Sequence, residues 1–176
     1  MYEPKHCEVI TGDLLACPDE MIVHQCNCMN TGVVGGIAGL IFARHPEADP
    51  HRNHPGVPSE PGSAEFCVSP FRPIVANLYG QVNPGGPSED PGDPDHPDAR
   101  YNLFKQALRL FGNTIIGVKD EIWRDRHDEV TIGFPWQIGC GIAGGDWDGR
   151  YFPLIDRFAG EMAAYGFKVH IYKLPE

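Results

Sequence analysis

The hydrophobic and polar positions along the chain follow two spacings in turn, and these predict strands and helices. Short, largely apolar runs predict six strands, at 7–10, 21–27, 63–69, 73–80, 129–135 and 167–174. Apolar side chains at helical spacing predict three helices, at 36–45, 100–123 and 151–166. Within the second of these we expect a bend or an end near Gly112.

The order of these elements predicts the fold class. Strands and helices mix along the chain, and this order favours a mixed six-stranded sheet between helix layers, which is a three-layer α/β/α sandwich. A length of 176 residues suits one domain with a core of its own, and no composition break or repeat divides the chain. We therefore expect residues 1–176 to form a single α/β domain.

Proline is concentrated between the second strand and the second helix. Residues 45–98 hold 12 of the 17 prolines, so most of this region outside its two strands is expected to be loop. The segment 83–99 is rich in proline and carries five acidic residues. This composition predicts a surface excursion or a partly disordered loop rather than a binding element.

The charge of the chain limits its partners. The net charge is -10, with only 14 lysines and arginines, so the sequence offers no basic surface for a long nucleic acid. Any anionic ligand must be held locally, by backbone N–H groups. No apolar run reaches the roughly 20 residues of a membrane span, and the first residues lack the pattern of a signal peptide. We expect a cytoplasmic monomer that does not bind membranes.

The six cysteines form no C-x-x-C pair and are expected to be reduced thiols. His24, Cys26 and Cys28 would share one face of a strand, but the second ligand cluster that zinc needs is missing. The sequence therefore predicts neither a metal nor a cofactor.

Gly139, Gly141 and Gly144 match the G-x-G-x-x-G pattern of dinucleotide-binding Rossmann domains. That pattern normally follows the first strand and precedes an acidic residue at the end of the next strand. Here it lies in the last fifth of the chain, and the acids that follow, Asp156 and Glu161, fall within a predicted helix. The order of elements therefore excludes a Rossmann domain.

The physical part of the glycine pattern still applies. Glycines let the backbone approach an anion closely, and successive N–H groups form a concave site for phosphate oxygens. Two such loops follow predicted strands, at 27–38 and 138–147, and the first leads into a helix whose amino end favours negative charge. Two loops at neighbouring strand ends would suit a diphosphate.

Four segments together resemble macro domains. VITGDLL (9–15), HQCNCMNTGVVGGIAGLIFARHPEAD (24–49), NLYGQ (77–81) and IGCGIAGGDW (138–147) occur in the order, and at about the spacing, of that family. HQCN and GCGIAGGDW are most similar to the subgroup associated with processing of ADP-ribose 1''-phosphate. The resemblance implies a macro domain that binds ADP-ribose or its 1''-phosphate, with ADP-ribosylated protein as a further partner.

The resemblance also implies roles for individual residues. Asp13, with Leu14 beside it, would accept a hydrogen bond from the adenine amino group, and Asn27 would meet the distal ribose or position a water. The remaining ligand-binding residues it implies are Gly35, Gly36, Ile37, Ala38, Tyr79, Gln81, Gly139, Cys140, Gly141, Ile142, Ala143, Gly144 and Gly145. Turn geometry alone would also explain Asp13, Asn27 and the glycines.

Hydrolysis at C1'' needs an oriented water and a group that moves a proton. The catalytic candidates are Asn27, His24 and Asp146, although His24 would also suit the core and Asp146 would also suit a helix cap. Core packing is the alternative for Tyr79, and Cys140 has no basic neighbour to activate it.

Three functions are compatible with these residues. The first is an ADP-ribose 1''-phosphate phosphatase or ADP-ribosyl hydrolase. The second is a module that reads ADP-ribose without turnover, and the third is a different nucleotide-binding domain, which would prefer NAD. A related branch uses a lysine after the fourth strand and an aspartate after GCG, but Gln81 and Ala143 stand near those places, so lysine-dependent chemistry is not expected.

Overall fold

The protein is built around one six-stranded sheet. The computed structural model describes residues 2–32, 34–68, 73–125 and 128–175. In sequence order the strands are β1 (Glu8–Thr11), β2 (Met21–Asn27), β3 (Ala64–Cys67), β4 (Ile74–Gln81), β5 (Val130–Pro135) and β6 (Phe167–Lys173). Their order in space is β1-β6-β5-β2-β4-β3, and every neighbouring pair is parallel except β3 with β4.

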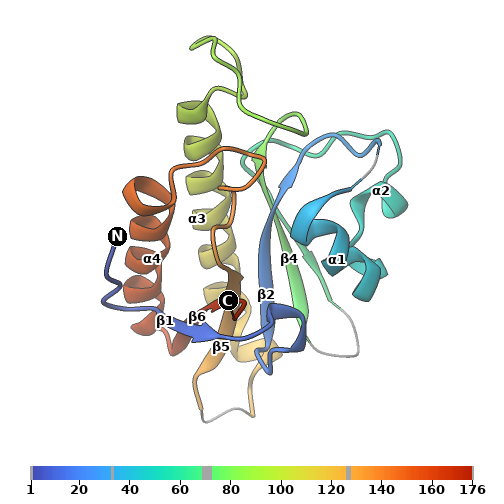
Figure 1. Ribbon diagram of the computed structural model, residues 1–176. Helices are drawn as coiled ribbons and strands as arrows, with labels where there is room; N and C mark the ends of the chain where they lie inside the picture. The colour runs from blue at the N-terminus through green and yellow to red at the C-terminus, as the bar shows by residue number, and fades with distance from the viewer. Residues whose placement is uncertain (1, 33, 69–72, 126–127, 176) are drawn as a thin grey trace.

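Helices cover both faces of this sheet. The α-helices are α1 (Gly36–Arg44), α2 (Pro50–Asn53), α3 (Pro97–Ile122) and α4 (Phe152–Ala163), and three short helical turns lie at Leu14–Ala16, Pro46–Ala48 and Trp147–Tyr151. Figure 1 shows α3 and α4 on one face of the sheet and α1 with α2 on the other. The predicted three-layer sandwich with a mixed six-stranded sheet is confirmed.

Apolar packing on the two faces accounts for the layers. Phe104 and Phe111 of α3 and Phe158 of α4 belong to one buried cluster, and Ile41 and Phe42 of α1 belong to another. All eight residues of β4 are buried, as expected for a strand that is covered on both faces. In the part of the chain that the structure describes, no helix is long and apolar enough to cross a membrane.

Gly112 does not end α3, although a bend or an end was expected there. The helix runs from Pro97 to Ile122 through this position. A Cβ on Gly112 would lie 2.8 Å from Cε2 of Phe158. The glycine therefore serves close contact between α3 and α4, and this packing outweighs its poor helix propensity.

Most residues of the acidic segment at 83–99 are exposed, as expected of a surface excursion, and Asp95 ties the segment to the domain. Asp95 is only 4% exposed and accepts hydrogen bonds from the backbone N–H groups of Val82 and Asn83, both at 2.9 Å. The guanidinium of Arg100 donates to the same carboxylate at 3.0 Å. A buried acceptor with this many donors folds the segment back onto the end of β4.

A buried carboxylate on α4 fastens the amino-terminal segment. Asp156 is 1% exposed and accepts from the backbone N–H groups of Lys5, His6 and Cys7 and from the hydroxyl of Tyr2. Burial by itself would raise the pKa of Asp156, but these donors outweigh burial and lower the pKa to about 2.

This carboxylate should make folding sensitive to acid. Because the pKa is lower in the folded chain, its stabilisation is present above about pH 4 and is lost as the pH falls towards 2, with a total of about 2 kcal/mol. Asp156→Asn should remove that part of the pH dependence of the free energy of unfolding, measured by urea titration. Glu161→Gln, on the exposed side of α4, is the control. Equal pH dependence in Asp156→Asn and the unmodified chain would contradict this account.

Candidate functional site

A large pocket lies along one edge of the sheet. It has a volume of about 1070 Å³ and is lined at the carboxyl ends of five strands by Asp13, Asn27, Gln81, Trp136 and Lys173. Because β1, β6, β5, β2 and β4 are parallel, these ends all meet at the same edge. Such an edge is where open α/β sheets commonly bind ligands.

The first glycine loop brings the amino end of a helix to this pocket. Gly35, Gly36, Ile37 and Ala38 line it, and α1 begins at Gly36. Among the described residues no side chain caps this helix, and Gly36 has a φ of +62°. The uncapped N–H groups and the helix dipole favour an anion at this end.

The second glycine loop forms the wall that follows β5. Its turn is closed by backbone hydrogen bonds from Cys140 to Gln137, from Gly144 to Gly141 and from Gly145 to Gly139, at 2.9–3.0 Å. The residues of this loop that line the pocket are Ile138, Gly139, Gly141, Ile142, Ala143 and Trp147. Both predicted glycine loops therefore border one cavity.

Three pocket glycines leave open space. Apart from chain neighbours, no atom of the described residues lies within 4 Å of a Cβ built on Gly35, Gly36 or Gly141. Protein packing explains other glycines of the second loop, since a Cβ on Gly145 would lie 2.6 Å from the carbonyl oxygen of Gly139. It does not explain Gly35 or Gly141, where a side chain would fit the protein but would stand beside the space for a ligand.

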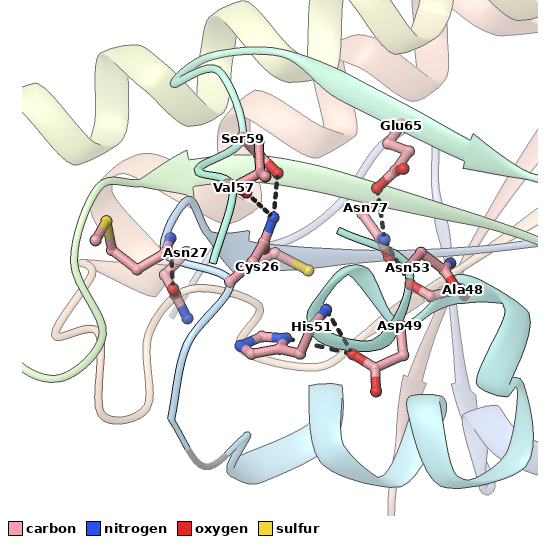
Figure 2. Close-up of polar contacts among 12 residues, drawn as sticks. Cys26, Asn27, Ala48, Asp49, His51, Asn53, Val57, Ser59, Glu65 and Asn77 are labelled. Carbon is pink, nitrogen blue, oxygen red and sulfur yellow. Dashed lines mark hydrogen bonds and ion pairs between the residues drawn. The ribbon is translucent and has the colours of Figure 1, made fainter. Parts of the chain in front are cut away.

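Most of the predicted binding residues come together here. Those that line the pocket are Asp13, Leu14, Asn27, Gly35, Gly36, Ile37, Ala38, Gln81, Gly139, Gly141, Ile142 and Ala143. Asp13 and Asn27 also have the turn roles considered above, because each accepts a backbone N–H through Oδ1, from Leu15 and Met29 respectively, at 2.9 Å. Figure 2 shows the Asn27 amide with its nitrogen left outside that bond.

His24 does not reach the pocket, which corrects its proposed catalytic role. It is fully buried, and its Nε2 lies 2.6 Å from Oδ1 of Asn77. The ring of Phe42, which does line the pocket, packs against it at 5.3 Å between centroids. Burial lowers the pKa of His24 to about 4, against a smaller opposing effect of Asn77. The alternative, a core histidine with a satisfied hydrogen bond, describes this residue.

Asp146 also has its structural role rather than a place in the pocket. Its side chain caps the turn at Trp147–Tyr151, where Oδ1 accepts from the N–H of Gly149 at 2.9 Å. The pocket lining includes Asp148 but not Asp146.

Tyr79 and Cys140 support the pocket walls from outside. Tyr79 is 2% exposed and donates its hydroxyl to Oε2 of Glu65 at 2.5 Å. The thiol of Cys140 donates to the carbonyl of Ile138 at 3.2 Å, and burial raises its pKa to about 12, so it stays protonated. Gly144 and Gly145 shape the second loop without lining the cavity.

Several residues that line the pocket were not predicted from the sequence. Gln25 donates through Nε2 to Oε1 of Gln81 at 2.9 Å, while its own Oε1 is buried without a partner among the described residues. Its spacing of two from Asn27 on β2 was the available signal. His51 of α2 and residues 84–85 of the acidic segment also contribute, and no local pattern marks them.

No side-chain cluster suggests a resident metal. Within the described ranges, no group of three or more histidine, cysteine, aspartate or glutamate side chains could hold a metal ion.

The fold of this chain is similar to that of several solved structures. No family model and no curated protein sequence matches this chain. A macrodomain of Mycobacterium tuberculosis DarG is 18% identical with a TM-score of 0.62, and the match covers 97% of this chain and 99% of that one. A Streptomyces coelicolor macrodomain is 24% identical with a TM-score of 0.58, covering 95% and 98%.

The protein has the macrodomain fold. A third macrodomain structure with this fold, from Trypanosoma brucei, was solved in complex with ADP-ribose. It is 13% identical with a TM-score of 0.56, and the match covers 95% of this chain and 63% of that one. At these identities the likeness concerns the fold, and the chemistry of this macrodomain-like chain must be argued from its own pocket.

Proposed function

We propose that the pocket binds ADP-ribose, with the diphosphate between the two glycine loops. The open space beside Gly35 and Gly141 is the observation that carries this proposal, because packing within the protein does not require glycine there. Backbone N–H groups and the amino end of α1 supply the attraction for phosphate that this acidic chain lacks in its side chains. The Trypanosoma brucei complex with ADP-ribose adds support from a protein of the same fold.

The positions of two polar side chains suggest how ADP-ribose is oriented in the pocket. Asp13 follows β1 at one edge of the sheet, and Asn27 ends β2, with β6 and β5 lying between these strands. At about 4.8 Å between neighbouring strands, the two residues are separated by roughly 14 Å of sheet. The adenine would lie near Asp13 and the distal ribose near Asn27, so that the diphosphate crosses between the loops.

Hydrolysis of substituents at C1'' is the activity we propose for this site. The amide of Asn27, fixed through its Oδ1, has donors left to orient a ribose hydroxyl or a water. The substrates would be ADP-ribose 1''-phosphate or an ADP-ribosyl ester on protein. The alternative is a module that binds ADP-ribose without turnover. The position of His24 and Asp146 outside the pocket lining supports this alternative.

Turnover can be measured directly. The unmodified chain should release phosphate from ADP-ribose 1''-phosphate, and Asn27→Ala should slow release by about 100-fold because water or ribose is no longer oriented. Asn113→Ala, on the exposed side of α3, is the control. Binding of ADP-ribose without any release would replace the hydrolase by the reader.

A further inference from the structure

We propose that His51 is the catalytic proton-transfer residue of this pocket, an inference that rests on the hydrolase function proposed above. The titratable side chains that line the pocket are Asp13, Cys26, His51, Asp148, Tyr172 and Lys173. Asp13, Tyr172 and Lys173 belong to the β1 and β6 side, where the adenine is placed. The Cys26 thiol is buried, which raises its pKa well above the usual value. Asp148 follows the second glycine loop and already accepts the backbone N–H of Tyr2 at 2.9 Å.

Hydrogen bonds connect the region of α2, which carries His51, to the chain that follows β2. The chain that follows α2 is joined to the chain that follows β2, because Asn30 donates through Nδ2 to the carbonyl of Val57 at 2.5 Å. The backbone N–H of Ser59 donates to the carbonyl of Cys28 at 2.8 Å, and that of Gly56 to Asn30 at 3.0 Å. These bonds hold α2 next to the segment that begins at Asn27.

The imidazole ring lies on the same side as Asn27. In Figure 2 the ring of His51 extends from α2 in the direction of the Asn27 amide, and both residues line the pocket. Phe42 separates the two histidines of this region, with its ring 6.3 Å from that of His51 and 5.3 Å from that of His24. His51 therefore faces the cavity, whereas His24 lies behind Phe42 in the core.

A carboxylate stands behind the ring. Oδ1 of Asp49 accepts the backbone N–H of His51 at 3.0 Å and lies 3.3 Å from its Nδ1. The distance from Oδ1 of Asp49 to Nδ1 of His51 is that of an ion pair. Nδ1 of His51 has no hydrogen-bond partner among the described residues. A carboxylate this near stabilises the imidazolium that forms when Nε2 takes a proton.

The reaction can then be written for ADP-ribose 1''-phosphate. Nε2 of His51 takes a proton from water, and the water oxygen forms a bond to phosphorus. The bond from phosphorus to O1'' breaks and leaves its electron pair on O1'', which receives the proton from His51. The products are inorganic phosphate and ADP-ribose. For an acyl ester, the same proton path serves attack at the acyl carbon.

The test compares two neighbouring histidines. His51→Gln should lower kcat for phosphate release by a factor of about 100 to 10,000, the usual contribution of a general acid–base group. The KM and the calorimetric Kd for ADP-ribose should change by less than about twofold, since the group acts in the reaction step. His54→Gln, at a side chain 58% exposed and outside the pocket lining, should leave kcat unchanged.

The outcomes separate the two proposals. If the unmodified chain turns over and His51→Gln turns over equally fast, His51 is not the proton-transfer residue and the hydrolase function stands. If His51→Gln loses ADP-ribose binding together with activity, its role is in binding and the inference is overturned. If the unmodified chain binds ADP-ribose and releases no phosphate or acyl group, the hydrolase function fails and His51 has no proton to transfer.

Discussion

Replacing Arg100 with methionine should lower the free energy of unfolding by about 3 kcal/mol, the lower end of the cost of breaking a buried ion pair. Arg100 is 2% exposed, and its Nε donates to Asp95 at 3.0 Å. Burial by itself would raise the pKa of Asp95, but donors from Asn83, Val82 and Arg100 lower it, so the carboxylate stays ionised. Methionine fills a similar volume and leaves that charge with fewer donors.

The same substitution should weaken ligand binding. Nη1 of Arg100 donates to the carbonyls of Gly85 at 2.9 Å and Ala143 at 3.1 Å, so one side chain joins the acidic segment to the second glycine loop. Both carbonyls belong to pocket residues. Without the guanidinium, the loop that holds the diphosphate loses a fixed support, and the Kd for ADP-ribose should rise.

Urea unfolding and calorimetry of Arg100→Met provide the measurement. Arg109→Met is the matched control, because Arg109 lies on the exposed side of α3. It should change the free energy of unfolding by no more than about 0.5 kcal/mol, as surface substitutions usually do. Equal stability of the two variants would show that the buried ion pair does not support the fold.

Substitutions at two glycines of the second loop should have different effects, one on stability and the other on ligand binding. Gly139→Ala should lower the free energy of unfolding by about 2 kcal/mol, because a residue with a side chain is strained at a φ of +70°. Its Cβ would also meet Oε1 of Gln25 and would lie 2.8 Å from Cε1 of Tyr151.

Gly141→Val should leave the free energy of unfolding within about 0.5 kcal/mol of the unmodified chain, since no described atom outside the chain neighbours of Gly141 lies within 4 Å of the new Cβ. It should raise the Kd for ADP-ribose about tenfold or more, because the side chain takes space beside the diphosphate. Stability is measured by urea unfolding and affinity by calorimetry. An unchanged Kd in Gly141→Val would mean that the ligand does not pass this loop.

Long elements and their layers could be predicted from the sequence because periodicity reports burial directly. The largely apolar run of β2 and the helical spacing in α3 and α4 give such signals. The helix α2 was missed because four residues that begin with a proline carry no period. The role of Gly112 was missed because it depends on close packing against Phe158, which is distant in the sequence.

The parts of the site formed by the backbone of local loops could be predicted from the sequence. The parts that depend on contacts between distant residues were missed. Glycine-rich segments that follow strands can be recognised in the sequence, so both glycine loops that border the pocket could be located. His24 was a poor catalytic candidate because it lies three residues before the end of β2, where it is fully buried against Phe42. The approach of His51 to the pocket depends on hydrogen bonds across the fold, such as that of Asn30 with Val57, which spacing does not reveal.

Calorimetric titration of ADP-ribose into the unmodified chain tests the central claim most directly. We expect one site per chain with a Kd in the micromolar range, and weaker binding of adenosine monophosphate, which lacks the diphosphate. Absence of binding, or tighter binding of NAD than of ADP-ribose, would contradict the account of the two glycine loops.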